Sequence, residues 1–239
     1  MKDINMRNLI SKLKYFFCIY KIVNLNGLTF IISILNLGWS EFMSVYKNIA
    51  EFLDFINISN EKFTLFEWKP ARSMRRFDLD LNIIKENPIS DIFFHKDKGN
   101  MKIVYIRKHN LIYTVGASPR VQYQLLEALL EYVDLKFNEI YDVKVILSYG
   151  NFSPGLFGGF KQNTEDIIKN FADLDLVKRI HVECRVCNAV LPLFVKKSVI
   201  ENAESHPVPI VYSHKGHAIL CFIDRNFQHR GIELVNITG

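Results

Sequence analysis

Cys184 and Cys187 form the pair of residues whose type and spacing point most directly to chemistry. Two cysteines three positions apart can hold one side of a tetrahedral zinc ion, because both thiolates reach the same point. A complete site needs two further ligands, and His214 and His217 follow downstream at the same spacing. This set of four residues predicts a structural zinc site. Further candidate ligands are His181, His206 and Cys221.

Two other interpretations of the cysteine pair stay open. The cysteines can pack as small hydrophobic side chains, or they can form a redox pair. A thioredoxin-like redox pair begins a helix after a strand, whereas here an apolar segment with a proline, Val190–Val195, follows. The sequence therefore disfavours the redox interpretation.

No other motif indicates catalysis. The segment Gly155–Lys161 superficially resembles a phosphate loop but lacks the G-K-[ST] signature. The chain also contains neither a GxSxG nor a HExxH motif, and it lacks the signature of an RNA-binding sheet. We therefore predict no catalytic residues and no cofactor besides the zinc, and we expect no nucleic-acid partner.

The composition indicates a folded protein of a reducing compartment. The chain has 239 residues, of which 49% are hydrophobic and 23% charged, enough to bury a large core and too apolar for general disorder. The net charge of +5 is mild. Four cysteines at irregular spacing argue against secretion, so we expect a cytoplasmic protein with membrane association as an alternative.

The N-terminal segment Tyr15–Trp39 is apolar but interrupted. A membrane span needs roughly 20 apolar residues in succession, and Lys21 and Gly27 break this run. We predict a β-hairpin over Phe16–Ile32 with its turn at Gly27. Two alternatives stay open: a membrane-associated segment, and an extension upstream of a true start at Met43.

The next elements are predicted from periodicity and turn residues. Ser40 caps a helix over Glu41–Phe55, and a short strand follows at Phe63–Phe66. An antiparallel meander comes next, with strands at Asp91–His95, Met101–Ile106 and Leu111–Gly116. Between these parts lies a basic cluster that indicates either a solvated loop or a surface for an anionic partner. The cluster consists of Lys69, Arg72, Arg75 and Arg76.

Two helices are predicted after the meander. Ser118 and Pro119 open a long helix that ends at about Phe137 and carries an apolar stripe wide enough to cover a sheet. A last helix starts at Thr164, and its inward residues are Ile167, Ile168 and Phe171. After Leu176 the chain becomes rich in strand-like segments, which predicts a small β-rich module over residues 177–239.

This order of elements is similar to that of the longin-like family, which is related to profilin and roadblock domains. Lys102–Val115 resembles the paired strands of adaptor small chains and of the signal-recognition-particle receptor's N-terminal domain. Gln122–Tyr141 resembles the long helix that follows these strands, and Phe157–Phe160 resembles the loop before the closing helix in archaeal trafficking-like proteins. The resemblance implies an α+β fold, an α-β-α sandwich around a five-stranded antiparallel sheet.

The resemblance also implies a domain organisation. Residues 1–14 form a tail, residues 15–176 form the longin-like domain, and residues 177–239 form the β-rich module. Ile58–Pro88 is then an insertion, because longin domains cross between the first helix and the meander in far fewer residues.

The implied function is protein binding without catalysis. Longin-like domains contact small GTPases, coat or tether subunits, or a second domain of their own kind, so the expected partner is a small GTPase, another longin- or roadblock-type protein, or a second copy. The expected interface residues on the long helix are Leu125, Leu129, Tyr132 and Val133. Two alternatives stay open: a zinc protein centred on Cys184 and Cys187, and a peripheral membrane protein.

Overall fold

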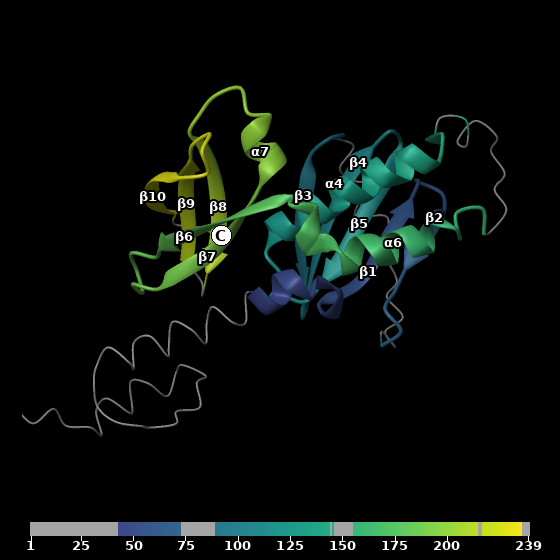
Figure 1. Cartoon of the computed structure of the whole chain (residues 1–239), viewed down its shortest axis with the longest axis horizontal. Helices are drawn as coiled ribbons and strands as arrows, with labels where there is room; N and C mark the ends of the chain where they lie inside the picture. The colour runs from purple at the N-terminus through teal and green to yellow at the C-terminus, as the bar shows by residue number, and fades with distance from the viewer. Residues whose placement is uncertain (1–42, 73–88, 144, 146–154, 215–216, 236–239) are drawn as a thin grey trace, which may run out of the picture. The chain divides into compact units, whose positions relative to one another are not determined.

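The computed structural model describes residues 43–72, 89–143, 145, 155–214 and 217–235. All described residues belong to one compact unit, Met43–Gly239. There, helices pack on a five-stranded antiparallel sheet, and smaller antiparallel sheets follow towards the C-terminus (Figure 1). The predicted α+β class is confirmed.

The large sheet is formed by residues 53–117. Its strands are β1 (Leu53–Ser59), β2 (Thr64–Trp68), β3 (Phe93–Lys98), β4 (Met101–Lys108) and β5 (Leu111–Ala117). They lie in the order β2-β1-β5-β4-β3, each antiparallel to its neighbour, so β2 and β3 are the edges. The tight β4–β5 turn uses His109 and Asn110, both with left-handed backbone. The predicted meander is confirmed.

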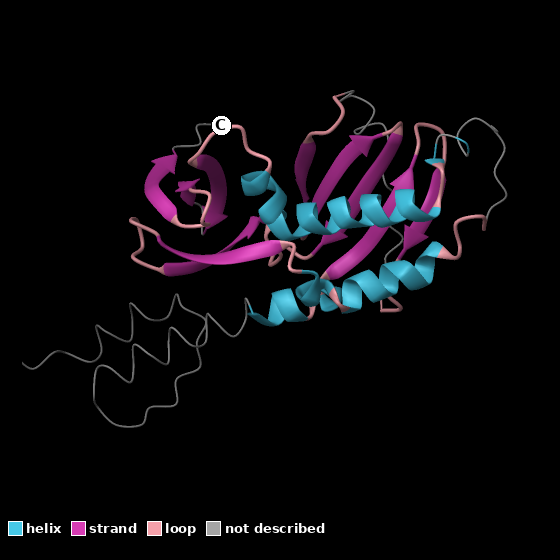
Figure 2. Cartoon of the chain, turned by 45° about the horizontal axis from the view of Figure 1, so that its top comes forward, coloured by secondary structure: helices cyan, strands magenta, loops and turns pink. Residues whose placement is uncertain are grey.

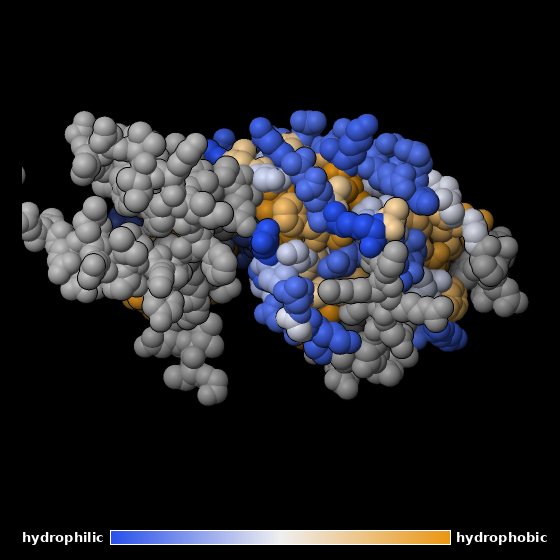
Figure 3. Space-filling view, turned by 90° about the horizontal axis from the view of Figure 1, so that it is seen from below, coloured by the Kyte–Doolittle hydropathy of each residue, from blue (hydrophilic) through white to orange (hydrophobic). Residues whose placement is uncertain are grey.

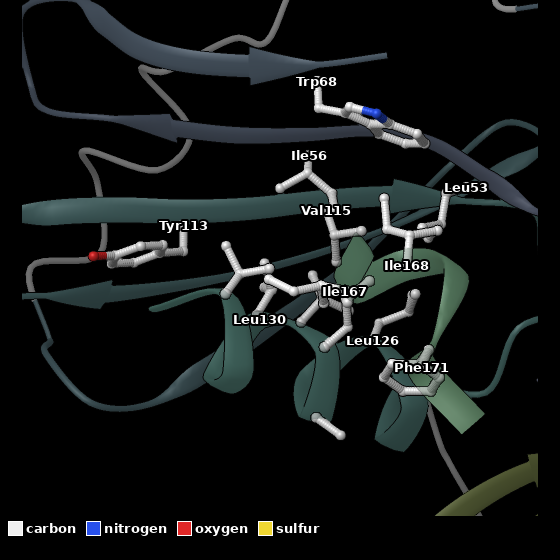
Figure 4. Packing of buried hydrophobic residues seen from close by; sticks show 14 of the residues in the cluster. Leu53, Ile56, Trp68, Tyr113, Val115, Leu126, Leu130, Ile167, Ile168 and Phe171 are labelled. Atoms are coloured by element: carbon white, nitrogen blue, oxygen red, sulfur yellow. The ribbon is translucent and has the colours of Figure 1, made fainter. Parts of the chain in front are cut away.

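One face of this sheet is apolar and lies under two helices, α4 (Tyr123–Ile140) and α6 (Phe160–Lys169) (Figure 2). Ile56 and Val115 are register partners on adjacent strands, and both are fully buried. Leu126 and Leu130 of α4 and Ile168 of α6 pack in the same cluster (Figure 4). Burying such a side chain contributes about 1.5–3 kcal/mol, so this layer holds the helices on the sheet.

The other face of the sheet contains a close approach of an aromatic ring to the backbone. Phe55 lies so near Gly116 that a Cβ added there would fall 2.1 Å from a ring carbon of Phe55. The next side chains on this face are Tyr105, stacked on Phe94 at 5.1 Å between ring centroids, and the buried Thr114. Glycine is required at position 116 because any side chain there would occupy the volume of the Phe55 ring.

The C-terminal residues form a hairpin and a three-stranded sheet. Their elements are β6 (Val177–Glu183), β7 (Val190–Lys196), α7 (Lys197–Glu201), β8 (Val208–His214), β9 (His217–Ile223) and β10 (His229–Val235). Side chains of β7 alternate between two cores. Phe194 belongs to the core of the large sheet, whereas Leu193 and Val195 belong to the core of the smaller sheets. The boundary predicted after Leu176 therefore lies next to strands that both cores share.

The helix predicted over Glu41–Phe55 is wrong in its second half. Residues 43–47 are helical and a short 3-10 helix, η1 (Ile49–Glu51), follows, but β1 begins at Leu53. The helical spacing of Val45, Ile49 and Leu53 was misleading because all three are buried in the same core. Burial alone does not tell whether consecutive apolar residues share one element.

The prediction for the first hairpin of the sheet is also corrected. The segment Phe16–Ile32 lies outside the described residues, and the sheet instead takes its first hairpin from β1 and β2. The predicted insertion Ile58–Pro88 therefore includes residues of two sheet strands. Across the described part of the chain, no helix is long and apolar enough to cross a membrane; the alternative for Tyr15–Trp39 lies outside that part.

Both predicted helices exist with different starts. Ser118 does not cap α4: its carbonyl accepts a hydrogen bond from the Val121 N–H in a turn, and α4 begins at Tyr123. The second of these helices, α6, begins at Phe160, ahead of the predicted start at Thr164. The Thr164 hydroxyl instead donates to the Phe160 carbonyl at 2.9 Å inside the helix.

Candidate functional site

A group of charged side chains meets where α4, the sheet edge β3 and the β7–α7 segment come together. Lys196 Nζ lies 2.7 Å from Glu131 Oε1 and 3.1 Å from Glu127 Oε2. The other oxygen of Glu127 lies 2.8 Å from His95 Nε2, and the Ser198 hydroxyl donates to Glu131 at 2.7 Å. We call these five residues, His95, Glu127, Glu131, Lys196 and Ser198, the charged junction.

Two members of the junction, Glu127 and Lys196, are buried, which strengthens the interactions between them. The side chains of Lys196 and Glu127 are 4% and 7% exposed, and the Lys196 ammonium also lies 4.1 Å from the centre of the Phe93 ring. Burial raises the pKa of Glu127, but the hydrogen bonds and charges of His95 and Lys196 outweigh it and hold this pKa below its usual value. Glu127 is therefore an anion that needs both partners.

A second polar group on the first turn of α4 extends the junction along the sheet. The Tyr123 hydroxyl donates to Asp97 of β3 at 2.7 Å, and its ring stacks on His95 with 4.2 Å between centroids. Burial and the neighbouring Asp97 carboxylate raise the pKa of Tyr123. Burial lowers the pKa of Lys102, which donates to the Val121 carbonyl at 3.0 Å. These contacts tie the start of α4 to β3 and β4.

Two glutamines at the start of α4 pair with the backbone of β7: Gln122 lies just before the helix and Gln124 lies within it. The Gln122 amide donates to the Pro192 carbonyl at 2.8 Å and accepts from the Phe194 N–H at 3.0 Å. Gln124 accepts from the Lys196 N–H at 3.0 Å. β7 is an edge of the β6–β7 sheet, and unpaired edge groups invite further strand pairing. The glutamine amides therefore protect this edge and bind the C-terminal module to α4.

Chemically, the junction is built to hold elements together. Every charged group in it is engaged by another member, since Lys196 contacts two carboxylates and both oxygens of Glu127 and of Glu131 have partners. Sequence reasoning missed all five residues. The available signal was the presence of Glu127 and Glu131 inside the most apolar stretch of the long helix, where an unpaired charge would be costly.

Three of the four predicted interface residues are core residues, so that prediction is wrong for them. Leu125, Leu129 and Val133 are 1%, 0% and 0% exposed, and all three belong to the core on the large sheet. Only Tyr132 is half-buried. The apolar stripe faces the sheet, and β7 covers the opposite side of the first turns. A partner therefore cannot reach these three side chains.

The predicted metal ligands lie in two turns of the C-terminal module. Cys184 and Cys187 lie in the turn between β6 and β7, and His214 and His217 are the last register pair of β8 and β9. The histidine side chains lie outside the described part. Within that part, no group of three or more His, Cys, Asp or Glu residues is placed to hold a metal ion.

The additional candidate ligands have other roles. His206 Nε2 lies 3.0 Å from the Ile200 carbonyl, and its Nδ1 accepts from Arg225 at 3.1 Å. Cys221 is fully buried, and burial raises the pKa of its thiol to about 11. Burial, with a smaller effect of Arg179, lowers the pKa of His181.

The structure describes two of the four residues of the predicted basic cluster, Lys69 and Arg72. Lys69 forms an ion pair with Glu67 at 2.9 Å, and Arg72 donates to the Ala50 carbonyl at 2.9 Å, while Arg75 and Arg76 lie outside the described residues. Lys69 also lines a groove of about 490 Å³ between η1, the end of β2 and α6. Its other cations are Lys47, Lys161 and Lys169, and its acids are Glu51 and Glu165. The underside of the molecule, seen in Figure 3, has hydrophobic surface between hydrophilic side chains.

The Asp224–Gly231 segment forms the β9–β10 hairpin turn, as predicted. Asp224 Oδ1 accepts from the N–H groups of Asn226 and Gln228 at 2.8 and 2.9 Å. Its other oxygen accepts from Arg230 at 2.6 Å. Asp224 therefore serves the turn.

In comparisons with known proteins, the chain matches no protein-family model and no curated protein.

Proposed function

We propose that this chain is a non-enzymatic protein-binding module of the longin-like type. The partner class, a small GTPase or another longin- or roadblock-type protein, comes from the resemblance of Lys102–Val115 and Gln122–Tyr141 to that family. The observation that carries the proposal is an exposed stretch of α4 directly beyond the charged junction. We call Tyr132, Leu135, Lys136 and Glu139 the outer turn.

The outer turn has the character of a binding surface. Leu135 is 51% exposed, and the half-buried Tyr132 ring lies one turn before it on the same side of the helix. The Lys136 ammonium lies 5.5 Å from the centre of that ring and forms an ion pair with Glu139 at 2.6 Å. Aromatic and apolar side chains inside a charged rim are typical of interfaces.

The rest of the helix supports a binding role rather than a catalytic one. Residues Leu125–Leu130 are all buried, because the sheet lies on one side and β7 on the other. The charged junction fixes this arrangement, and its ionic groups are occupied by one another. The outer turn is therefore an accessible surface on a rigid support, which lowers the entropic cost of binding.

The experiment is a pull-down with the full chain as bait, once with a non-hydrolysable GTP analogue and once with GDP. We expect a small GTPase, or a longin- or roadblock-type protein, to be recovered in greater amount than by beads alone. Leu135→Glu should weaken that binding at least about tenfold, because a buried leucine contributes about 1.5–3 kcal/mol.

The matched control is Ile92→Glu, since Ile92 is 50% exposed and lies just before β3. This variant should bind like the wild type. Equal binding by Leu135→Glu and wild type would refute the outer turn as the interface. Sedimentation of the chain alone tests the remaining partner, a second copy, because self-association through this turn would also be lost in Leu135→Glu.

A second candidate function, binding to an anionic membrane surface, is supported by the lysine-lined groove. Four lysines line it against two glutamates, and basic residues near a surface attract anionic lipids. Vesicle flotation with and without phosphatidylserine tests it. Flotation that does not depend on the anionic lipid would exclude this function.

A further inference from the structure

The lysine-lined groove between η1, the end of β2 and α6 has the size of a small-molecule site. Its volume is about 490 Å³, and such sites typically measure about 300–1,000 Å³. The helix α6 packs against both η1 and β2. The Arg72 guanidinium donates to the carbonyls of Ala50 and Leu53 at 2.9 and 3.4 Å, which ties the end of β2 to η1 and β1. The elements that form the groove therefore hold one another in place.

The least exposed residues that line the groove are apolar. Trp68 of β2 and Ile168 of α6 both belong to the core between the sheet and the helices (Figure 4). Ala50 and Pro70 also line the groove, and both are half-buried. Ligand sites are lined mostly by such side chains, with a few polar groups that fix the orientation of the ligand. A ligand in the groove can therefore bury an apolar portion against these residues.

The groove also contains hydrogen-bond donors that no described residue uses. Lys47, Lys161 and Lys169 line it, and none of them forms an ion pair or a hydrogen bond with a described residue. The same is true of the Trp68 indole N–H, although Trp68 is only 6% exposed. Polar groups of buried side chains usually have a partner. An indole N–H without one, beside three such lysines, points to a ligand that accepts hydrogen bonds.

The charges of the groove indicate which kind of ligand it takes. Four lysines and two glutamates line it, so two ammonium groups remain even when each glutamate is matched by a lysine. The fourth lysine, Lys69, pairs with Glu67, but these side chains are 29% and 40% exposed, and exposed pairs are weak enough to exchange partners. A phosphate monoester carries a charge of about −1.5 to −2 at pH 7. This charge matches the positive excess of the groove.

We propose that this groove binds a phosphate monoester that carries an apolar portion. The lysine ammonium groups and the Trp68 N–H donate to the phosphate oxygens, and the apolar portion lies against Pro70 and Ile168. Two sources have this chemistry: a soluble ester such as a nucleoside monophosphate, and a lipid with a terminal phosphate. The proposal deepens the second candidate function, on whose groove it rests, because it names the phosphate monoester as the group that the groove recognises.

The test follows the fluorescence of Trp68 in the full chain with Trp39→Phe, since the chain has two tryptophans. One arm titrates adenosine monophosphate against adenosine, and the other compares vesicles that contain phosphatidic acid with vesicles of equal charge that contain phosphatidylserine. We expect a saturable change with adenosine monophosphate, with phosphatidic acid, or with both, and the responding arm identifies the source. No response to either phosphate monoester beyond that of its control would overturn the proposal. Flotation with phosphatidylserine would then still support the second candidate function, so the two failures are distinguishable.

Variants then assign the binding to the groove. The double variant Lys161→Gln with Lys169→Gln should weaken binding of the responding monoester about tenfold, because it removes two ammonium groups at exposed positions of α6. The matched control is Lys62→Gln, an exposed lysine between β1 and β2 that does not line the groove. This control should bind like the wild type. Equal affinity of the double variant and the control would overturn the groove as the site.

Discussion

Replacing Lys196 with methionine tests the central claim about the charged junction, namely that the buried ammonium is what allows two carboxylates to remain inside. Methionine keeps most of the volume and removes the charge. Glu127 would then keep only His95 as a partner, and Glu131 would keep Ser198. Glu127 and Glu131 would then gain water only if α4 and β7 rearranged. Without such a rearrangement, their negative charges would keep too few hydrogen-bond and ionic partners.

The expected cost follows from burial. Lys196 and Glu127 are 4% and 7% exposed at their side chains, so this ion pair is buried, whereas Glu131 is 30% exposed. Removing one partner of a buried ion pair costs about 3–5 kcal/mol. At 1.4 kcal/mol per factor of ten, the ratio of folded to unfolded protein should fall by a factor of roughly 100 to 4,000.

The adjacent residue is a matched control. Lys197 also pairs with an aspartate, Asp175, but these side chains are 25% and 74% exposed, and exposed pairs contribute about 0–1 kcal/mol. Equilibrium unfolding in urea at pH 7 should therefore show a large drop in the free energy of unfolding for Lys196→Met and a small one for Lys197→Met, at similar slopes. Equal losses in the two variants would refute the assignment of the junction as the buried joint between α4 and β7. The double variant Lys196→Met with Glu127→Gln should lose less than the sum of the single variants, because it removes both charges of one pair.

Three further outcomes are expected from single positions. The pKa of Glu127 is held low in the folded protein, so its contribution to stability is complete above the ordinary glutamate pKa of about 4.3 and is lost as pH falls through the lowered value. Urea midpoints should therefore fall more steeply below about pH 4.3 in wild type than in Glu127→Gln, and equal slopes would contradict this. Gly116→Ala should destabilise by about 1–3 kcal/mol, because its Cβ would overlap the Phe55 ring, while Gly159→Ala, whose Cβ would lie 3.7 Å from the Tyr141 hydroxyl oxygen, should change stability little. Thermal unfolding compares the two variants. Thr114→Val should be neutral or stabilising by up to about 1 kcal/mol, since the buried Thr114 hydroxyl has no hydrogen-bond partner among the described residues. A clear loss of stability in urea would mean that this hydroxyl is satisfied.

Local sequence patterns were sufficient to predict the elements that are separated by clear turn residues. The strands β3, β4 and β5 follow from short β-branched runs separated by Gly99–Asn100 and His109–Asn110. The helix α6 and its inward residues Ile167 and Ile168 follow from the 3.6-residue period, whereas Phe171 is buried but lies in a 3-10 helix (Phe171–Leu174) after α6 ends at Lys169. In these segments, period and turn chemistry agree, so each element can be predicted without its neighbours.

Pattern failed where a residue's partner is distant in the sequence. Leu53 fits a helical stripe with Val45 and Ile49, yet it begins a strand because β5 pairs with it at Ala117. The stripe of Leu125, Leu129 and Val133 reveals an apolar helix face but not whether that face meets the sheet or a partner protein. Burial by a distant strand decides this, and the sequence of the helix carries no information about it.

The α+β class, the meander, the long helix and the positions of the cysteine and histidine pairs could be predicted from local patterns. The β2-β1-β5-β4-β3 order, the use of β7 by two cores, and the meeting of His95 with Glu127 and Lys196 became known only from the packing of the elements. The reason is physical. Turns and periodicity depend on residues a few positions apart, whereas a buried charge is stable only beside partners that the packing of remote elements brings to it.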